Sequence, residues 1–326
     1  MRLYLISILI CTLGIILPHN IIASDTDYYI NILKYGTDSD IENAFNGVYE
    51  DQGDRVNEAV FGTFDGPHSD KMMMSLVRYL SIVSADTPSG QAALRTAQIL
   101  NKEMTREGVT VDYLEEVIYA AGEAKAKSCV APMTGIFQNK RTQKRIRLAV
   151  VDAWGKIRDM SVEGVLLNVL RDDYEDTEMK ARAIRALGEM ESAASVDILE
   201  RTVKNTYEPK LLRMYAAFAL SQVGKESALD ILEEVIYDKN HEVAEYAVRG
   251  IAELNCDRCG EVLIKALRSD YDKVRYYAVI GLSRLRYTDS VEILQFKAEH
   301  DANERVREEA KKAVELLTED GKGDEN

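Results

Sequence analysis

The chain has 326 residues, of which 41 are Lys or Arg and 55 are Asp or Glu, so its formal net charge at pH 7 is −14. Nucleic-acid phosphates select basic surfaces, and this balance therefore argues against a nucleic-acid partner. The sequence has no pattern of a nucleophile with its base, of a metal-ligand set or of a glycine-rich phosphate loop. We therefore expect neither an enzymatic activity nor a cofactor.

The N-terminus has the pattern of an export signal. Arg2 precedes an apolar run at residues 3–17, and a second short apolar segment ends at Ala23. The run is shorter than the roughly 20 residues that a membrane-spanning helix needs. The pattern predicts a signal peptide at residues 1–23, cleaved after Ala23, and a mature protein in the periplasm or outside the cell without a stable membrane span. An uncleaved N-terminal membrane anchor is the alternative.

Residues 24–109 show a weak helical pattern, which we interpret as divergent repeats behind an N-terminal cap at residues 28–35. Turn signals separate four apolar helical segments in this part of the chain. These segments are residues 41–49, 56–64, 72–83 and 92–104. They predict two helical hairpins.

Residues 110–317 carry a pattern that recurs every 31 to 33 residues. Its anchors are Val117, Val150, Ala183, Ala216, Ala247, Ala278 and Ala310. Apolar residues four before, four after and seven after each anchor lie on one helical stripe, which predicts a buried face. The residues three and five after the anchor are mostly Ala, Gly or Ser, so neighbouring backbones can approach closely. A second amphipathic helix is marked by Leu166, Leu199, Leu232, Leu263 and Leu294, each sixteen residues past its anchor.

Each unit is thus predicted to be a helical hairpin. A single hairpin buries too few large side chains to offset the entropy of ordering its chain, so the units must stack. Residues 304–317 form a lone first helix that should cap the stack, and the acidic tail at 318–326 is expected to be disordered.

The segments at 274–282 and 180–188 resemble the first helix of HEAT repeats, and more closely the short bacterial HEAT-like form of PBS-lyase type. The resemblance covers residues 110–317. It implies an all-α fold, a right-handed α-solenoid of stacked antiparallel helix pairs of HEAT or armadillo type. It also implies that the second helices line the concave side, and it leaves function open, because one fold hosts many functions.

Charged residues recur in phase with the repeat. A basic ladder comprises Arg147, Lys180, Arg213, Arg275 and Arg307, and Glu175, Glu208, Asp270 and Asp301 stand at the starts of the units. We expect these groups to link neighbouring repeats as exposed pairs worth about 0–1 kcal/mol each. A second ladder comprises Asp197, Asp230, Glu261 and Glu292. Acidic side chains near helix N-termini are stabilised by the helix dipole and the unpaired amides there, which is the structural interpretation of this ladder. The alternative is an acidic stripe that binds a basic partner or a cation.

Three further groups have both a structural and a functional interpretation. Lys140, Arg141, Lys144 and Arg145 form a basic cluster that is either a solvated helix face or an anion patch. Cys256 and Cys259 form a CxxC pair, which either forms a disulfide or supplies small residues at a helix start. Tyr215, Tyr246 and Tyr277 occupy one position in three successive repeats, where partial burial between repeats is favoured over a binding surface.

We therefore expect an exported, non-enzymatic scaffold or adaptor that binds a protein or peptide on its curved surface. The candidate contact residues are the second ladder, Asp197, Asp230, Glu261 and Glu292, together with Asn168, Arg201, Glu234, Lys265 and Phe296. The alternatives are an enzyme's accessory subunit or a lyase-like HEAT protein, and an envelope protein that contacts cell-wall material.

Overall fold

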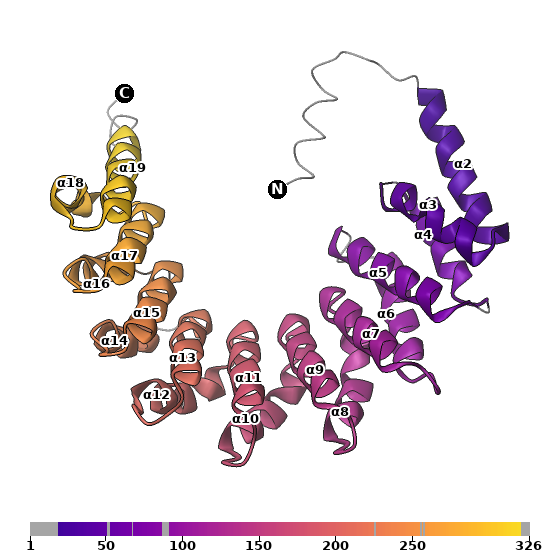
Figure 1. The fold of residues 1–326 in the computed structure, drawn as a ribbon, viewed down its shortest axis with the longest axis horizontal. Coiled ribbons are helices and arrows are strands. Elements are labelled where there is room, and N and C mark those ends of the chain that lie inside the picture. Colours follow the sequence, from indigo (N-terminus) through magenta and orange to yellow (C-terminus); the bar gives the residue numbers. More distant parts are fainter. Residues whose placement is uncertain are drawn as a thin grey trace. The chain divides into compact units, whose positions relative to one another are not determined.

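The computed structural model describes residues 19–50, 53–66, 68–86, 91–224, 226–254, 256 and 258–320. These residues form α-helices and short 3-10 helices, and no strand occurs among them. The chain divides into two compact units, residues 1–129 and 130–326. Each unit is a stack of antiparallel helix pairs, which confirms the expected α-solenoid (Figure 1).

Unit 1 contains six helices and one 3-10 turn among its described residues. They are α2 (His19–Tyr35), α3 (Asp38–Glu50), α4 (Asp54–Thr63), α5 (Asp70–Asp86), α6 (Gln91–Met104), α7 (Val111–Glu123) and η1 (Lys127–Cys129). Helices α2, α4 and α6 pack in one layer, and α3, α5 and α7 pack in the other. The four predicted hairpin segments correspond to α3 to α6. Helix α7 and η1, which we placed in the first regular repeat, belong to this unit.

The predicted signal peptide lies mostly outside the described residues, which begin at His19. The predicted cleavage site after Ala23 falls within α2. Across the described ranges, no helix is both long enough and apolar enough to cross a membrane.

Unit 2 alternates long first helices with shorter second helices. The first helices are α9 (Lys144–Ile157), α11 (Thr177–Glu189), α13 (Lys210–Val223), α15 (His241–Glu253), α17 (Asp272–Arg284) and α19 (Glu304–Asp320). The second helices are α8 (Val130–Gln138), α10 (Glu163–Arg171), α12 (Val196–Lys204), α14 (Glu226–Val235), α16 (Cys259–Ala266) and α18 (Val291–His300). The 3-10 turns η2 (Met160–Val162), η3 (Ala193–Ser195) and η4 (Thr288–Ser290) precede three of the second helices. Helix α19 includes residues 318–320 of the predicted tail, and the rest of that tail lies outside the described residues.

The anchors and their small neighbours form the contact between repeats. All seven anchors are fully buried. A Cβ atom added at Gly188, five residues after its anchor, would lie 2.9 Å from the Cβ of Ala219, three residues after the next anchor. The same juxtaposition recurs between Gly155 and Ala186. The small residues therefore allow first helices to approach closely, as predicted, and Trp154 is fully buried beside Phe137, with ring centroids 5.1 Å apart.

Three members of the basic ladder link repeats through pairs that are buried or partly buried, rather than the exposed pairs that we expected. Arg275 donates to both carboxylate oxygens of Asp301, at 2.8 Å and 2.7 Å, and also to the carbonyls of Ser269 and Asp270. Arg275 is 9% exposed and Asp301 6%. Two further links join Arg213 to Asp238 and Arg147 to Glu175. The repeat buries these groups because each guanidinium also donates to carbonyls at the end of the preceding second helix.

Four first helices of unit 2, α9, α11, α13 and α17, are followed by a left-handed residue eight positions after the anchor. Arg158, Glu191 and Arg286 have φ of 56°, 56° and 50°, and Gly224 has φ of 72° at the same position. Lys125 adopts this conformation after α7, with φ of 49°. Glycine is favoured there because it has no Cβ to collide with the backbone, so the four non-glycine residues are under local strain.

Unit 2, taken by itself, is curved with its first helices on the inner side (Figure 1). Consecutive first helices pack directly against each other, whereas consecutive second helices are farther apart. The prediction that the second helices line the concave side is therefore wrong for this unit. The physical reason is the row of small residues on the first helices, which draws them together and splays the second helices.

Candidate functional site

The predicted partner-binding residues lie on the outer side of unit 2. Asp197, Asp230, Glu261 and Glu292 are all exposed, as are Arg201, Glu234, Lys265 and Phe296. Asp197, Glu261 and Glu292 stand in the first turns of α12, α16 and α18, which agrees with stabilisation of helix N-termini. The residues share one helix layer, but that layer faces away from the concave side.

Several of these side chains are engaged by neighbours in the same layer. Lys204 lies 2.8 Å from the carboxylate of Glu234, and Lys265 pairs with Glu233. Arg258 donates to Asp230 at 2.9 Å and to Glu233 at 3.2 Å. Around α14 the second-helix layer therefore carries ion pairs that engage Asp230 and Glu234.

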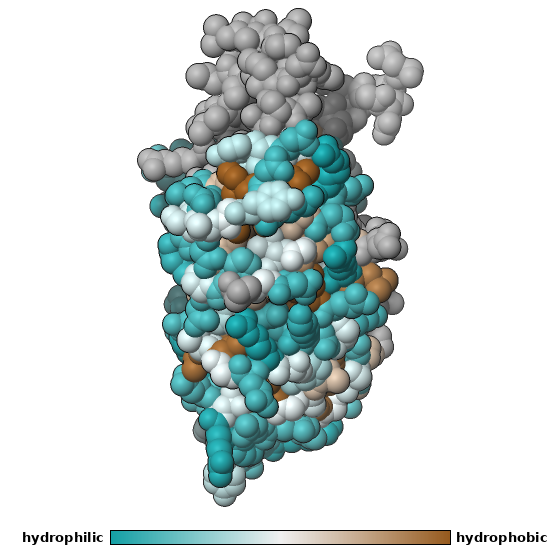
Figure 2. Space-filling view, turned by 90° about the vertical axis from the view of Figure 1, so that its right-hand side faces the viewer, coloured by the Kyte–Doolittle hydropathy of each residue, from teal (hydrophilic) through white to brown (hydrophobic). Residues whose placement is uncertain are grey.

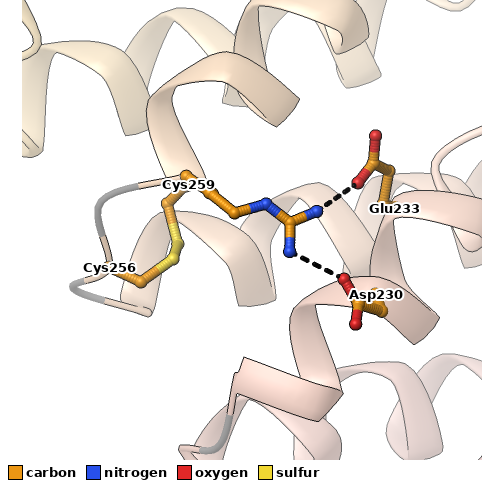
Figure 3. Close-up of a disulfide and its surroundings, with 5 residues drawn as sticks. Asp230, Glu233, Cys256 and Cys259 are labelled. Carbon is orange, nitrogen blue, oxygen red and sulfur yellow. Dashed lines mark hydrogen bonds and ion pairs between the residues drawn. A yellow bond between two sulfur atoms is a disulfide. The ribbon is translucent and has the colours of Figure 1, made fainter.

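Cys256 and Cys259 form a disulfide at the start of α16, with Cα atoms 5.3 Å apart (Figure 3). Cys259 is fully buried, whereas Cys256 is partly exposed. The two-residue interval includes Arg258, so the disulfide tethers the segment that reaches Asp230 and Glu233 on α14. The arrangement fixes the entry into α16 against the preceding repeat.

The basic cluster lies at the turn into α9. Lys140, Arg141, Lys144 and Arg145 are all exposed. Lys144 is 2.8 Å from Asp176 and 3.1 Å from Glu178 on the next repeat, and hydrogen bonds to these carboxylates raise the pKa of its ammonium. Part of the cluster is therefore neutralised by contacts within the protein.

Aromatic side chains gather on the inner face of α13, α15 and α17. Tyr215, Tyr246 and Tyr277 are each partly buried, and the rings of Tyr215 and Tyr246 meet edge to face with centroids 6.3 Å apart. The guanidinium of Arg249 lies 4.9 Å from the centre of the Tyr246 ring and 5.1 Å from that of Tyr277. Phe218 packs against Tyr246 at 6.4 Å. We call these five residues the aromatic strip.

The sequence analysis identified the three tyrosines but not Phe218 and Arg249. Both lie two residues after their anchors, Ala216 and Ala247. That offset falls on the helix face opposite the buried stripe, whereas the tyrosine position, one residue before the anchor, flanks the stripe and packs against the core. The other repeats carry Tyr119, Asp152, Arg185, Ile280 and Lys312 at this offset, so no recurring residue type marked Phe218 and Arg249 in the sequence.

Two depressions flank the aromatic strip on the first-helix side. One of about 250 Å³ lies between α11 and α13 and is lined by Arg182, Arg185 and Tyr215 among others. The other, of about 660 Å³, lies between α17 and α19 and is lined by Tyr276 and Tyr277 with polar neighbours. The face drawn in Figure 2 is mainly hydrophilic, with apolar side chains in small separate groups.

Two titratable sites in unit 1, Cys129 and the pair of His68 with Asp38, are explained by their structural surroundings. Burial raises the pKa of the Cys129 thiol to about 11, so it is a thiol rather than a thiolate at neutral pH. The ring nitrogens of His68 lie 2.7 Å from the Asp38 carboxylate and 2.9 Å from the carbonyl of Thr63. The hydrogen bond with His68 is the main cause that lowers the pKa of Asp38 to about 2. The described part of the chain has no group of three His, Cys, Asp or Glu residues placed to hold a metal ion.

Comparison with solved structures finds helical repeat proteins at low sequence identity. Human deoxyhypusine hydroxylase in complex with glycerol is 17% identical, with a TM-score of 0.36, covering 81% of this chain and 96% of that one. The complex of CpcE and CpcF of phycocyanin lyase from Nostoc sp. PCC7120 is 15% identical, with a TM-score of 0.42, covering 68% and 94%. Kap121p is 15% identical, with a TM-score of 0.47, covering 91% of this chain and 38% of that one. Among curated proteins, no match is found.

The family model for HEAT repeats matches residues 163–252 and 234–315. These ranges coincide with α10 to α19, the part of unit 2 in which first and second helices alternate most regularly. The segment from residue 163 to residue 315 is therefore similar to HEAT repeats.

Proposed function

We propose that the protein is an exported scaffold or adaptor, without catalytic activity of its own, that binds a protein or peptide partner on the inner face of unit 2. The observation that supports this proposal most directly is the aromatic strip. Tyr and Arg are enriched among residues that dominate binding energy at protein interfaces. Here they stand together on one face, only partly buried within the chain itself.

The strip is also held in place before any partner arrives. Tyr246 contacts Tyr215 and Phe218 on the neighbouring helix, and Arg249 lies over the rings of Tyr246 and Tyr277. Side chains that are already ordered lose less conformational entropy on binding, so more of the contact energy appears as affinity. The repeat places them on packed helices rather than on loops, which favours a rigid binding surface.

The proposal is tested by comparing two faces of the same unit. The wild-type protein, a Tyr246→Ser/Arg249→Ser variant and an Asp197→Lys/Glu261→Lys variant are used as bait in an envelope extract of the source organism, with bound proteins quantified by mass spectrometry. We expect the inner-face variant to lose a partner that the outer-face variant retains. Loss in the outer-face variant alone would instead favour the second-helix residues as the contact surface.

Export is tested separately by fractionation of the source organism and N-terminal sequencing. We expect a mature chain that begins at Ser24 in the periplasm or the medium. A chain that starts at Met1 and sediments with the membrane would support the N-terminal anchor instead.

A further inference from the structure

A second row of aromatic residues follows the turns that lead into the first helices. Tyr174, Tyr207, Tyr237 and Tyr271 stand in the turns before α11, α13, α15 and α17. They are 99%, 96%, 65% and 37% exposed. We call them the turn tyrosines. Two of these rings are almost fully in water, and the same turn carries one in four successive repeats.

The turns lie along one edge of unit 2, where contacts join the turns before α15 and α17 and the starts of α13 and α15. Tyr271 donates its hydroxyl to the carbonyl of Lys239 in the preceding turn, at 3.0 Å. Lys210 at the start of α13 pairs with Glu242 at the start of α15. The turn tyrosines therefore share an edge that is distinct from the aromatic strip.

Each turn tyrosine has a carboxylate next to it in the chain. Tyr174 stands between Asp173 and Glu175, and Tyr271 stands between Asp270 and Asp272. Glu208 follows Tyr207, and Asp238 follows Tyr237. Glu175 and Asp238 are already paired with Arg147 and Arg213, so the negative charge offered to a ligand comes from Asp173, Glu208, Asp270 and Asp272. An aromatic face beside such a carboxylate favours a cation, because the ring quadrupole and the negative charge both attract it.

We propose that this edge binds a basic, extended peptide segment of a partner protein, with Lys or Arg side chains placed against successive turn tyrosines. Helices in contact are 8–10 Å apart, and an extended chain advances about 3.3 Å per residue. Successive turns are therefore matched by every third residue of the segment. This inference does not rest on the aromatic strip, and the two surfaces can be tested apart.

The test measures fluorescence anisotropy of a labelled peptide, acetyl-(Arg-Ser-Ser)5-amide, titrated with the full chain. A Tyr174→Ser/Tyr207→Ser/Tyr237→Ser variant should bind at least tenfold more weakly, since cation–π contacts are lost at three turns. Because these side chains are exposed, the variant should keep its fold, which circular dichroism checks. Tyr35→Ser, at an 83% exposed position in unit 1, is the matched control and should bind as the wild type does.

Two peptide controls separate the parts of the proposal. Replacing arginine by citrulline should abolish binding, and grouping the five arginines together should weaken it severalfold. Unchanged binding by the triple variant would overturn the role of the tyrosines, and equal binding of the grouped peptide would overturn the three-residue register. If the peptide does not bind and the chain instead forms a dimer that Lys140→Glu/Arg141→Glu dissociates, the occupant is a second copy and the proposal is wrong.

Discussion

Replacing Asp301 by Asn should weaken unit 2 by about 3 kcal/mol, the lower end of the range for breaking a buried ion pair. The change keeps the shape of the side chain but removes the charge that faces Arg275, and both groups are buried. The loss should not exceed the lower end, because Arg275 keeps its hydrogen bonds to the carbonyls of Ser269 and Asp270. The buried pair therefore contributes stability that an exposed pair would not.

The assay is urea unfolding followed by the fluorescence of Trp154. This residue is the only tryptophan of the chain and is fully buried in unit 2, so its emission reports the unfolding of that unit. Glu253→Gln is the matched control, because Glu253 pairs with Arg284 at a half-exposed site and its loss should cost less than about 1 kcal/mol. A loss for Asp301→Asn no greater than that of the control would refute the reasoning.

The stability difference between the wild type and the Asp301→Asn variant should depend on pH. Burial raises the pKa of Asp301, but hydrogen bonds from Arg275, the Asn303 amide and Lys297 outweigh it and lower the pKa from 3.8 to about 2. A carboxyl with a lowered folded-state pKa stabilises the protein above its unfolded value and loses that contribution as the pH falls. The difference in unfolding free energy between wild type and variant should therefore shrink by about 2 kcal/mol between pH 4 and pH 2. A constant difference across this range would contradict the assignment.

The remaining predictions concern packing, backbone strain and cysteine chemistry. Gly188→Val should destabilise unit 2 by about 1–3 kcal/mol, because even a Cβ there lies 2.9 Å from the facing alanine of the next repeat; unchanged urea unfolding would show that the helices can move apart. Lys125→Gly should stabilise the protein by roughly 0.5–1 kcal/mol by relieving a left-handed residue after α7, measured by thermal unfolding, and a lower midpoint would count against the strain. Thiol titration of the denatured, unreduced chain from residue 24 should find one thiol, that of Cys129, and three after reduction; three before reduction would rule out the disulfide between Cys256 and Cys259.

The repeat could be predicted from the sequence because its recurring residues are the ones that are buried between helices. Anchors such as Ala183 and Ala216 recur at a fixed interval, and a helix with apolar residues on one stripe has few ways to bury it. The small residues near Gly188 predicted close approach for the same reason. The burial of residues that pack against the neighbouring repeat can therefore be predicted from a single sequence.

What the sequence could not predict depends on the sum of many small displacements. The direction in which unit 2 curves follows from which helix layer packs more tightly. Gly155 and Gly188 indicate close packing of the first helices, but the direction follows only when this packing is compared with that of the second helices. The burial of Arg213 and Arg275 was likewise missed, because a charged residue in a repeat is ordinarily expected at the surface. Their carbonyl acceptors lie at the ends of the preceding second helices, five to ten residues away, where the pattern of side chains carries no signal.

The positions that the repeat leaves free are the ones that can distinguish this protein from others of its fold. An anchor or a buried arginine is fixed by packing, so a change there costs stability whichever partner is bound. Tyr207 is under no such constraint because it is almost fully exposed, and Phe218 and Arg249 are only partly covered by the rings of the neighbouring repeats. Aromatic side chains at such sites cost solubility in the free protein, and their recurrence in successive repeats is difficult to account for by folding alone. The inner face and the turn edge are therefore the two surfaces on which partner specificity should be sought. Variants of the exposed turn tyrosines should alter binding without altering the unfolding free energy, whereas variants of the partly buried strip should alter both.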